Sequence, residues 1–330
     1  MILTKTPLRV SLVGGGTDMV EFYSKHGGAV VSFGINKYIY VALNEKFEGG
    51  YRISYSITEL TNEPNEVKHD IVREALKEFK INSAEIVTIA DIPGGGTGLG
   101  SSSTFAVGLV LAMRKYKELG VNRSPFEFAE QAYKLERMLC RHPVGKQDHY
   151  AAAFGGLKFY EFNHEGSVTV APIRLRDDVF DDFQNRCMLF WMGKSRDGNR
   201  ILKEQAKNFK SGDNDKVGEM LRKCAIYLAE DLQDNNLDTV GDYLKENWSA
   251  KKQMANGISN PDIDFLYDMG IQAGADGGKL CGSGGSGFMF FFAKQSKQNA
   301  VEKAVGLRRV PIKISTEGTQ VIYEDGGRNV

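Results

Sequence analysis

The chain has 330 residues, of which 42% are hydrophobic and 25% charged, and its 42 basic and 42 acidic residues give a formal net charge of +0. This composition is ordinary for a globular protein with a substantial core, and the missing basic excess argues against nucleic-acid binding. Four dispersed cysteines without a CxxC argue against a zinc site or a disulfide framework, and the start resembles no signal peptide, so we expect a cytoplasmic protein that makes no contact with a membrane.

The first half of the chain is predicted to mix strands and helices. Alternating, β-branched and aromatic residues indicate strands, and apolar residues at helical spacing indicate helices. The expected strands are 8–13, 29–33, 38–43, 85–90 and 157–162, and the expected helices are 65–79, 101–116 and 126–140. The helix at 101–116 consists of small and apolar residues, which predicts that it is buried.

The second half is predicted to be mainly helical. Helices are expected at 196–209, 215–233 and 239–254, and strands at 288–292, 311–314 and 320–323. Strands and helices cluster instead of alternating, which favours an α+β fold in two lobes. We place the boundary near residue 165, with an N-terminal lobe over 1–165 and a C-terminal lobe over 166–330.

A glycine-rich loop follows the strand that ends at Ala90 and precedes the helix that begins near Ser101. Glycines allow close backbone approach, and a helix start presents unpaired N–H groups with the positive end of the dipole. This order of strand, loop and helix predicts a nucleotide phosphate site. Its residues are Pro93, Gly94, Gly95, Gly96, Thr97, Gly98, Leu99, Gly100, Ser101, Ser102 and Ser103.

Two better-known phosphate motifs do not fit this loop. A P-loop ends in Gly-Lys-Ser/Thr, and no lysine lies between 93 and 113. A dinucleotide fingerprint needs G-x-G-x-x-G, whereas the glycines at 94, 96, 98 and 100 alternate at every second position. Without a loop lysine, the phosphate charge must be neutralised from elsewhere.

Three separated motifs resemble the GHMP kinase superfamily, the group of galactokinase, homoserine kinase, mevalonate kinase and phosphomevalonate kinase. They are residues 6–18 (TPLRVSLVGGGTD), 93–104 (PGGGTGLGSSST) and 277–288 (GGKLCGSGGSGF). The resemblance implies a two-lobed fold with an N-terminal lobe like ribosomal protein S5 and a ferredoxin-like C-terminal lobe with extra helices. It also implies that the third motif lies against the phosphate loop.

Within this superfamily the chain most resembles D-glycero-D-manno-heptose 7-phosphate kinases and their fucokinase-like relatives. The segments 7–18 and 144–156 carry this likeness. His149 is a departure, because relatives usually have glutamine there.

The resemblance implies a catalytic pair. Asp148 aligns with the catalytic aspartate, which can accept or orient the proton of a sugar hydroxyl. Arg9 aligns with the basic residue that pairs with this aspartate and stabilises the transferred charge. Structural alternatives remain, since Asp148 could cap a helix and Arg9 could cover the core from a strand face.

The resemblance also implies a Mg²⁺ site at Ser102 and Glu136, since magnesium prefers hard oxygen ligands and needs only one or two protein groups beside the phosphates. Ser101 or Ser103 could replace Ser102. Glu136 could instead be a solvated helix carboxylate.

Substrate contacts are expected on both sides of a cleft between the lobes. Asp18 matches an aspartate that binds sugar hydroxyls, although it could equally cap a helix from Met19. A distal sugar phosphate needs basic residues, for which Arg196 and the pair Arg141–His142 are candidates. The substrate-binding residues expected from the resemblance are Gly15, Gly16, Asp18, Arg141, Arg196 and Gly284.

The function implied is transfer of a phosphoryl group from ATP, with Mg²⁺, to the anomeric hydroxyl of heptose 7-phosphate, giving the 1,7-bisphosphate used in nucleotide-activated heptose synthesis. The expected partners are therefore ATP and a sugar phosphate, and the expected state is a monomer or homodimer. Alternatives are another sugar-1-kinase such as a fucokinase-like enzyme, which would not need Arg196, a decarboxylase of the same superfamily, and an ATP-binding sensor without turnover.

Overall fold

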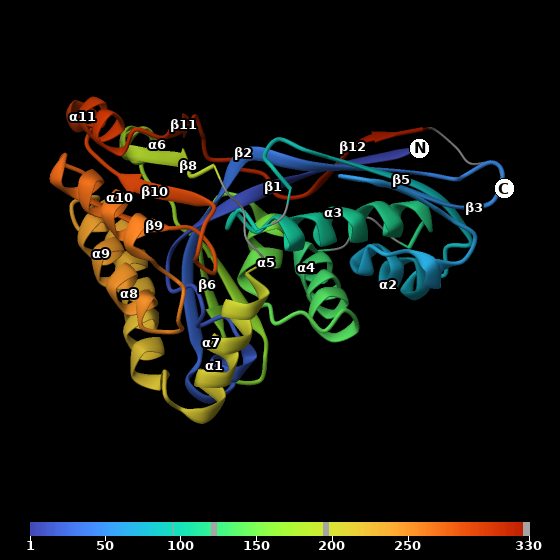
Figure 1. Ribbon diagram of the computed structural model, residues 1–330, viewed down its shortest axis with the longest axis horizontal. Coiled ribbons are helices and arrows are strands. Elements are labelled where there is room, and N and C mark those ends of the chain that lie inside the picture. The colour runs from blue at the N-terminus through green and yellow to red at the C-terminus, as the bar shows by residue number, and fades with distance from the viewer. Residues whose placement is uncertain (95, 120–123, 194–197, 326–330) are drawn as a thin grey trace.

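The structure is a computed structural model that describes residues 1–94, 96–119, 124–193 and 198–325. Long strands run through most of the length of the molecule, and a group of helices gathers at one end (Figure 1). None of the helices within those ranges is long and apolar enough to cross a bilayer.

The larger sheet has eight strands among the described residues, ordered β12-β1-β2-β5-β3-β4, with the hairpin β6–β7 joined to the first half of β2. Its strands are β1 (Ile2–Val13), β2 (Gly28–Asn44), β3 (Gly50–Ser54), β4 (Thr58–Thr61), β5 (Ser83–Ala90), β6 (Leu157–Phe162), β7 (Val168–Pro172) and β12 (Gln320–Glu324). Segments 29–33 and 38–43, predicted as separate strands, form the single strand β2. Its two halves pair with β6 and β5 respectively.

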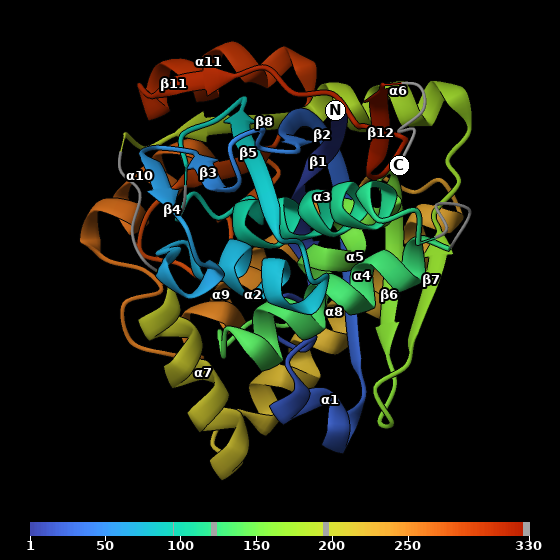
Figure 2. The ribbon, with the colours of Figure 1, turned by 90° about the vertical axis from the view of Figure 1, so that its right-hand side faces the viewer.

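Helices cover one face of this sheet, and α3 lies directly across it (Figure 2). They are α2 (Asp70–Glu78), α3 (Ser101–Tyr116), α4 (Pro125–Tyr133) and α5 (Gln147–Phe154). A π-helical turn, η2 (Lys134–Leu139), continues α4, and the short helix α1 (Val20–His26) follows the end of β1. Residues 103–114 of α3 are all buried, as the sequence predicts.

The smaller sheet has the order β11-β8-β10-β9 and belongs to the second half of the chain. Its strands are β8 (Cys187–Trp191), β9 (Gly277–Leu280), β10 (Phe288–Phe292) and β11 (Arg308–Val310). The helices of the second half are α6 (Asp177–Arg186), α7 (Asn199–Ser211), α8 (Asp215–Gln233), α9 (Val240–Lys252), α10 (Pro261–Gln272) and α11 (Gln295–Val305). Of these, α6, α9 and α10 pack on the smaller sheet, whereas α8 packs on β2 of the larger sheet. The clustering of strands and helices confirms the α+β class.

The predicted strand at 311–314 is wrong. The strand ends at Val310, before Pro311, which has no N–H to give to a ladder. Beyond it, backbone groups bond to side chains instead: Lys313 N–H donates to Asn36 Oδ1 at 2.7 Å, and Ile314 N–H donates to Gln184 Oε1 at 2.9 Å. Ile314 keeps only an isolated bridge to Ile35.

The predicted helix at 65–79 is interrupted. A 3₁₀ turn, η1 (Pro64–Glu66), comes first, and α2 begins only at Asp70. Between them the N–H groups of Lys68 and His69 donate to the carboxylate of Glu59 at 2.6 and 3.1 Å. These bonds take backbone donors that a continuous helix would use internally.

The boundary near residue 165 stays a prediction. Strands β7 and β12 both lie beyond it in the chain and belong to the larger sheet, and the β6–β7 hairpin crosses it. A division of this protein into lobes has to keep both strands with the N-terminal part.

Candidate active site

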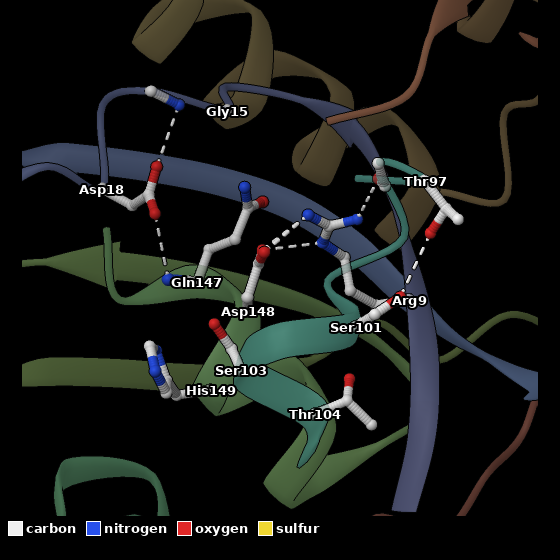
Figure 3. A network of polar contacts seen from close by, with 12 residues as sticks. Arg9, Gly15, Asp18, Thr97, Ser101, Ser103, Thr104, Gln147, Asp148 and His149 are labelled. Carbon is white, nitrogen blue, oxygen red and sulfur yellow. Dashed lines mark hydrogen bonds and ion pairs between the residues drawn. The ribbon is translucent and has the colours of Figure 1, made fainter. Parts of the chain in front are cut away.

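Arg9 and Asp148 form the centre of the site (Figure 3). Arg9 lies in the middle of β1 and is buried, and its Nε and Nη2 donate to the two carboxylate oxygens of Asp148, each at 2.7 Å. Its Nη1 donates to the carbonyl oxygen of Gly98 at 2.7 Å. One guanidinium therefore fixes the carboxylate to the glycine loop, while Asp148 stays about a quarter exposed.

Asp18 lies beside this pair at the end of the first glycine motif. Its carboxylate accepts the N–H groups of Gly16 at 2.9 Å and Gln147 at 3.1 Å (Figure 3). It does not cap α1, because Met19 is the N-cap residue and makes no side-chain cap bond. Burial, followed by the charge of Asp148, raises the pKa of Asp18. A Cβ on Gly145 would overlap the Asp18 carboxylate, which explains the glycine there.

The phosphate loop ends on α3 as the sequence predicts. Gly100, in the left-handed region, precedes α3, and Thr104 N–H makes the first backbone bond of the helix, to Gly100 O at 2.8 Å. The N–H groups of the first turn are thus directed out of the helix start. Leu99 differs from its neighbours, since its side chain is fully buried in the core. Gly95 lies outside the described residues. The loop residues that line the cavity are Pro93, Gly94, Gly96, Thr97, Gly98, Gly100, Ser101, Ser102 and Ser103.

The third glycine motif packs directly on this loop. Gly98 has φ +82°, and a Cβ there would overlap the carbonyl oxygen of Cys281. Reciprocally, a Cβ on Gly282 or Gly287 would overlap Gly98 or Thr97. The backbone of the second half of the chain thus approaches the phosphate loop closely, as the resemblance implied, and Gly284 lines the same cavity.

Glu136 is buried in the π-helical turn and holds the start of α3. Its carboxylate accepts the hydroxyls of Ser102 at 2.5 Å and Ser103 at 2.7 Å. His149 Nε2 lies 2.8 Å from its second oxygen. Although burial opposes ionisation, bonds from His142, His149 and Ser102 lower the pKa of Glu136, so it is an anion. His149 therefore places an imidazole against the predicted metal ligand.

His142 joins Glu136 to α2. Its Nε2 lies 2.7 Å from Asp70 Oδ2 and its Nδ1 lies 3.4 Å from Glu136 Oε1. Bonding to Asp70, then to Glu136, raises the pKa of His142 to about 10. The predicted residue pair Arg141–His142 is therefore split: His142 lines the cavity, whereas Arg141 is exposed, has φ +59° and is not part of the lining.

The predicted metal ligands fit a magnesium ion. Ser102 and Glu136 bring a hydroxyl and an anionic carboxylate together at the cavity wall, and hard oxygens of this kind suit Mg²⁺. In the described parts of the chain no cluster of three or more His, Cys, Asp or Glu residues could hold a metal. The pair would thus leave most coordination positions to phosphates and water.

A single cavity of about 850 Å³ joins these groups. One end is lined by apolar and aromatic residues beside the phosphate loop: Ile39, Tyr55, His69, Ile71, Ile92 and Phe105. The other end lies around Gly15, Gly16 and Asp18 and is closed by residues from α7 and α9. Arg196, predicted for this end, lies outside the described residues.

Three buried polar residues of the lining, Gln205, Lys251 and Lys279, are not among the site residues expected from the sequence. Burial lowers the pKa of Lys251 to about 8 and that of Lys279 to about 7. Lys279 stands inside the third motif, where a lysine among glycines and apolar residues is a usable signal. Lys251 sits in an ordinary Lys-Lys pair of a helix and carries no such signal.

Family comparisons define the class of protein. The GHMP kinases N-terminal domain matches residues 65–156, and the GHMP kinases C-terminal domain matches residues 228–309. The chain therefore belongs to the GHMP kinase family. It is a kinase, and kinases of this family use ATP.

Two known proteins are similar to this chain over most of its length. The chain is 33% identical to a D-glycero-alpha-D-manno-heptose 7-phosphate kinase of Campylobacter jejuni, over 92% of this chain and 93% of that protein. It is 26% identical to a bifunctional fucokinase/GDP-fucose pyrophosphorylase of Arabidopsis thaliana, over 92% of this chain and 30% of that protein.

Solved structures confirm the two-lobed GHMP kinase fold. A putative sugar kinase from Campylobacter jejuni matches with a TM-score of 0.73 and 27% identity, covering 97% of both chains. A D-glycero-D-manno-heptose 1-phosphate kinase from Bacteroides thetaiotaomicron has a TM-score of 0.79 and 24% identity, covering 98% of this chain and 100% of the other. At that identity the second match shows the fold alone.

Proposed function

We propose that this protein phosphorylates the anomeric hydroxyl of D-glycero-D-manno-heptose 7-phosphate with ATP, giving the 1,7-bisphosphate. The observation that carries the proposal is the Arg9–Asp148 pair, a partly exposed carboxylate fixed against the phosphate loop. The similarity over nearly the whole chain to a heptose 7-phosphate kinase supports the choice of substrate.

In this proposal the loop and the first turn of α3 hold the phosphates of ATP, the donor substrate. Unpaired N–H groups at a helix start and the helix dipole stabilise phosphate oxygens. Ser102 and Glu136 would hold Mg²⁺, which neutralises phosphate charge during transfer. Glu136 is suited to this role because its carboxylate is ionised and is held in place by Ser103 and His149.

The acceptor sugar lies at the other end of the cavity, beside Gly15, Gly16 and Asp18. Asp148 orients the attacking hydroxyl and accepts its proton as the phosphoryl group arrives. Arg9 keeps the carboxylate of Asp148 in one orientation and adds positive charge where negative charge accumulates. Gly284 contributes backbone to the same wall. Arg141 is not part of this proposal, because it does not reach the cavity.

An acceptor panel tests the proposal. ADP release would be measured with heptose 7-phosphate, fucose, galactose and mevalonate at equal concentrations. We expect the highest kcat/KM with heptose 7-phosphate. Brisk turnover of another acceptor without turnover of the heptose phosphate would contradict the substrate assignment and leave the kinase assignment intact.

A further inference from the structure

Lys251 is a buried cation of the cavity wall whose ammonium group contacts no acidic side chain among the described residues. Its Nζ donates to the carbonyl oxygen of Gly15 at 2.9 Å and to Gln205 Oε1 at 3.1 Å, both neutral acceptors. Over the described ranges of the chain, no carboxylate lies within ion-pair distance of it. A lysine ammonium has three N–H donors, so one donor remains for another partner, while the carboxylates of Asp18 and Asp148 act on its charge without contacting it.

Two other cations of the lining, Arg9 and His142, are held by carboxylates. Arg9 is bound to Asp148, and His142 to Asp70 and Glu136. Lys279 also lines the cavity and has only a neutral acceptor, the carbonyl oxygen of Leu12 at 3.1 Å, but it belongs to the third glycine motif, which packs on the phosphate loop. A buried charge without a counter-ion is costly, so Lys251 is poised for an anionic ligand. Burial lowers the pKa of Lys251 to about 8, although the nearby charge of Asp18 opposes this shift.

Because residue 16 is a glycine, the ammonium group of Lys251 is accessible from the end of the cavity around Gly15, Gly16 and Asp18. A Cβ on Gly16 would stand 3.1 Å from Lys251 Nζ and 2.8 Å from Met254 Cε. Both Gly16 and Lys251 line the cavity, and Lys251 contacts the 14–18 loop, not the phosphate loop. The anion it meets therefore comes with the acceptor and not with the loop that holds ATP.

Gln205 fixes the position of this lysine. It lies on α7 with Leu202, one turn earlier on the same helix face, and both line the cavity. Because an ammonium only donates, the amide oxygen of Gln205 must face Lys251, and its Nε2 then has no partner among the described residues. Gln205 thus orients Lys251 and keeps a second donor beside it.

We propose that Lys251, positioned by Gln205 and the Gly15 carbonyl, binds the phosphate ester of the acceptor sugar and so selects a phosphorylated acceptor. This inference rests on the proposed function and adds the residue that recognises the distal phosphate. Charge-assisted hydrogen bonds from a lysine to phosphate supply the recognition.

The test compares wild type with Lys251→Met and the near-isosteric Gln205→Glu, which removes the amide donor and places a carboxylate against Lys251. Lys252→Met is the matched control, because the neighbouring Lys252 is exposed and bonded to Asp264 at 3.1 Å. kcat/KM would be measured with heptose 7-phosphate and with the unphosphorylated heptose. Binding of heptose 7-phosphate without ATP would be followed by calorimetry.

We expect both cavity variants to lower kcat/KM for the phosphorylated acceptor about 10- to 100-fold more than for the free sugar. The KM for ATP should change much less, and Lys252→Met should match wild type. Equal losses with both acceptors, or a rise confined to the KM for ATP, would overturn the inference. In that case turnover of heptose 7-phosphate by the wild type would still uphold the proposed function. Binding that depends on Lys251 without turnover would support the inference and contradict the proposed function.

Discussion

Arg9 holds both oxygens of Asp148 at 2.7 Å and the Gly98 carbonyl at the same distance. Residues 139 positions apart in the chain are thereby tied to the phosphate loop by one side chain. Three of the five guanidinium N–H donors are used in this way, and a lysine could not reproduce the forked geometry.

Asp148→Asn preserves the size of the side chain but removes its charge and basicity. We expect kcat to fall about 100- to 10,000-fold, because an amide cannot accept the hydroxyl proton. ATP binding should remain, since the phosphate loop is untouched, and this would be checked by calorimetry. Asp242→Asn, at an exposed position paired with Lys245, is the control. An undiminished kcat in Asp148→Asn would refute the role given to Asp148.

Arg9→Lys keeps the charge and loses the fork. We expect kcat to fall about 10- to 100-fold with the fold retained, since charged hydrogen bonds to Asp148 and Gly98 are lost. Steady-state kinetics and circular dichroism would measure the two effects. Arg52→Lys, at a half-exposed position paired with Glu85 at 3.1 Å, should behave as wild type. If Arg9→Lys matched Arg52→Lys in rate, the forked contact would be irrelevant to catalysis.

Glu136→Gln removes the anionic oxygen of the proposed metal site. We expect the affinity for Mn²⁺ in the presence of ATP, read by electron paramagnetic resonance, to fall by at least about tenfold. Ser102→Ala should weaken metal binding in the same direction, whereas Ser101→Ala should not, because Ser101 bonds Thr97 and not Glu136. Wild-type metal affinity in Glu136→Gln would place the ion elsewhere.

Gly98→Ala introduces a Cβ at φ +82° where the Cys281 carbonyl already stands. We expect a loss of about 2–4 kcal/mol in the free energy of unfolding, from backbone strain and overlap together. Gly94→Ala is the matched control in the same loop, since no atom lies within 4 Å of its Cβ position. Denaturant unfolding of both variants would decide, and equal stability would mean that the two loops do not meet as described.

The carboxylate of Glu59, which lies away from the active site, should make the stability of the fold depend on pH. Burial would raise its pKa, but the N–H groups of Lys68 and His69 and the hydroxyl of Tyr55 outweigh burial and lower it. A lowered folded pKa contributes stability above the ordinary value of 4.5 and loses it as the pH falls through the folded value.

Glu59→Gln should therefore lower Tm at pH 7, and its difference from wild type should shrink as the pH drops below about 4.5. Thermal unfolding between pH 3 and 7 would measure this, with the exposed Glu48→Gln as control. A difference that stayed constant over that range would show that the carboxylate charge is not what stabilises the segment.

The sequence predicts the parts of this protein that local chemistry determines. Strand, glycine loop and buried helix follow from residue spacing at 85–116, and they appear where expected. The pairing of Arg9 with Asp148 and of Ser102 with Glu136 came from motif resemblance, and the structure brings both pairs into contact.

Other features depend on contacts between distant segments. Glu59 lies on β4, and its carboxylate accepts a backbone N–H group within the segment 65–79, predicted as one helix. No local sequence pattern reveals this contact. His142 and His149 meet only through Glu136, which lies in the π-helical turn Lys134–Leu139 that precedes both of them in the chain. Lys251 looks like a solvated helix lysine until α7 and the 14–16 loop are seen to enclose it.

Phosphoryl transfer to the anomeric hydroxyl of heptose 7-phosphate is tested most directly by phosphorus NMR of the reaction mixture. Heptose 7-phosphate, ATP and Mg²⁺ would be incubated with wild type and with Asp148→Asn. We predict a second phosphomonoester signal, coupled to the proton at C1, that grows with ADP in wild type and is nearly absent in Asp148→Asn. ADP formation without that signal, or a phosphate attached at any other carbon, would contradict the account.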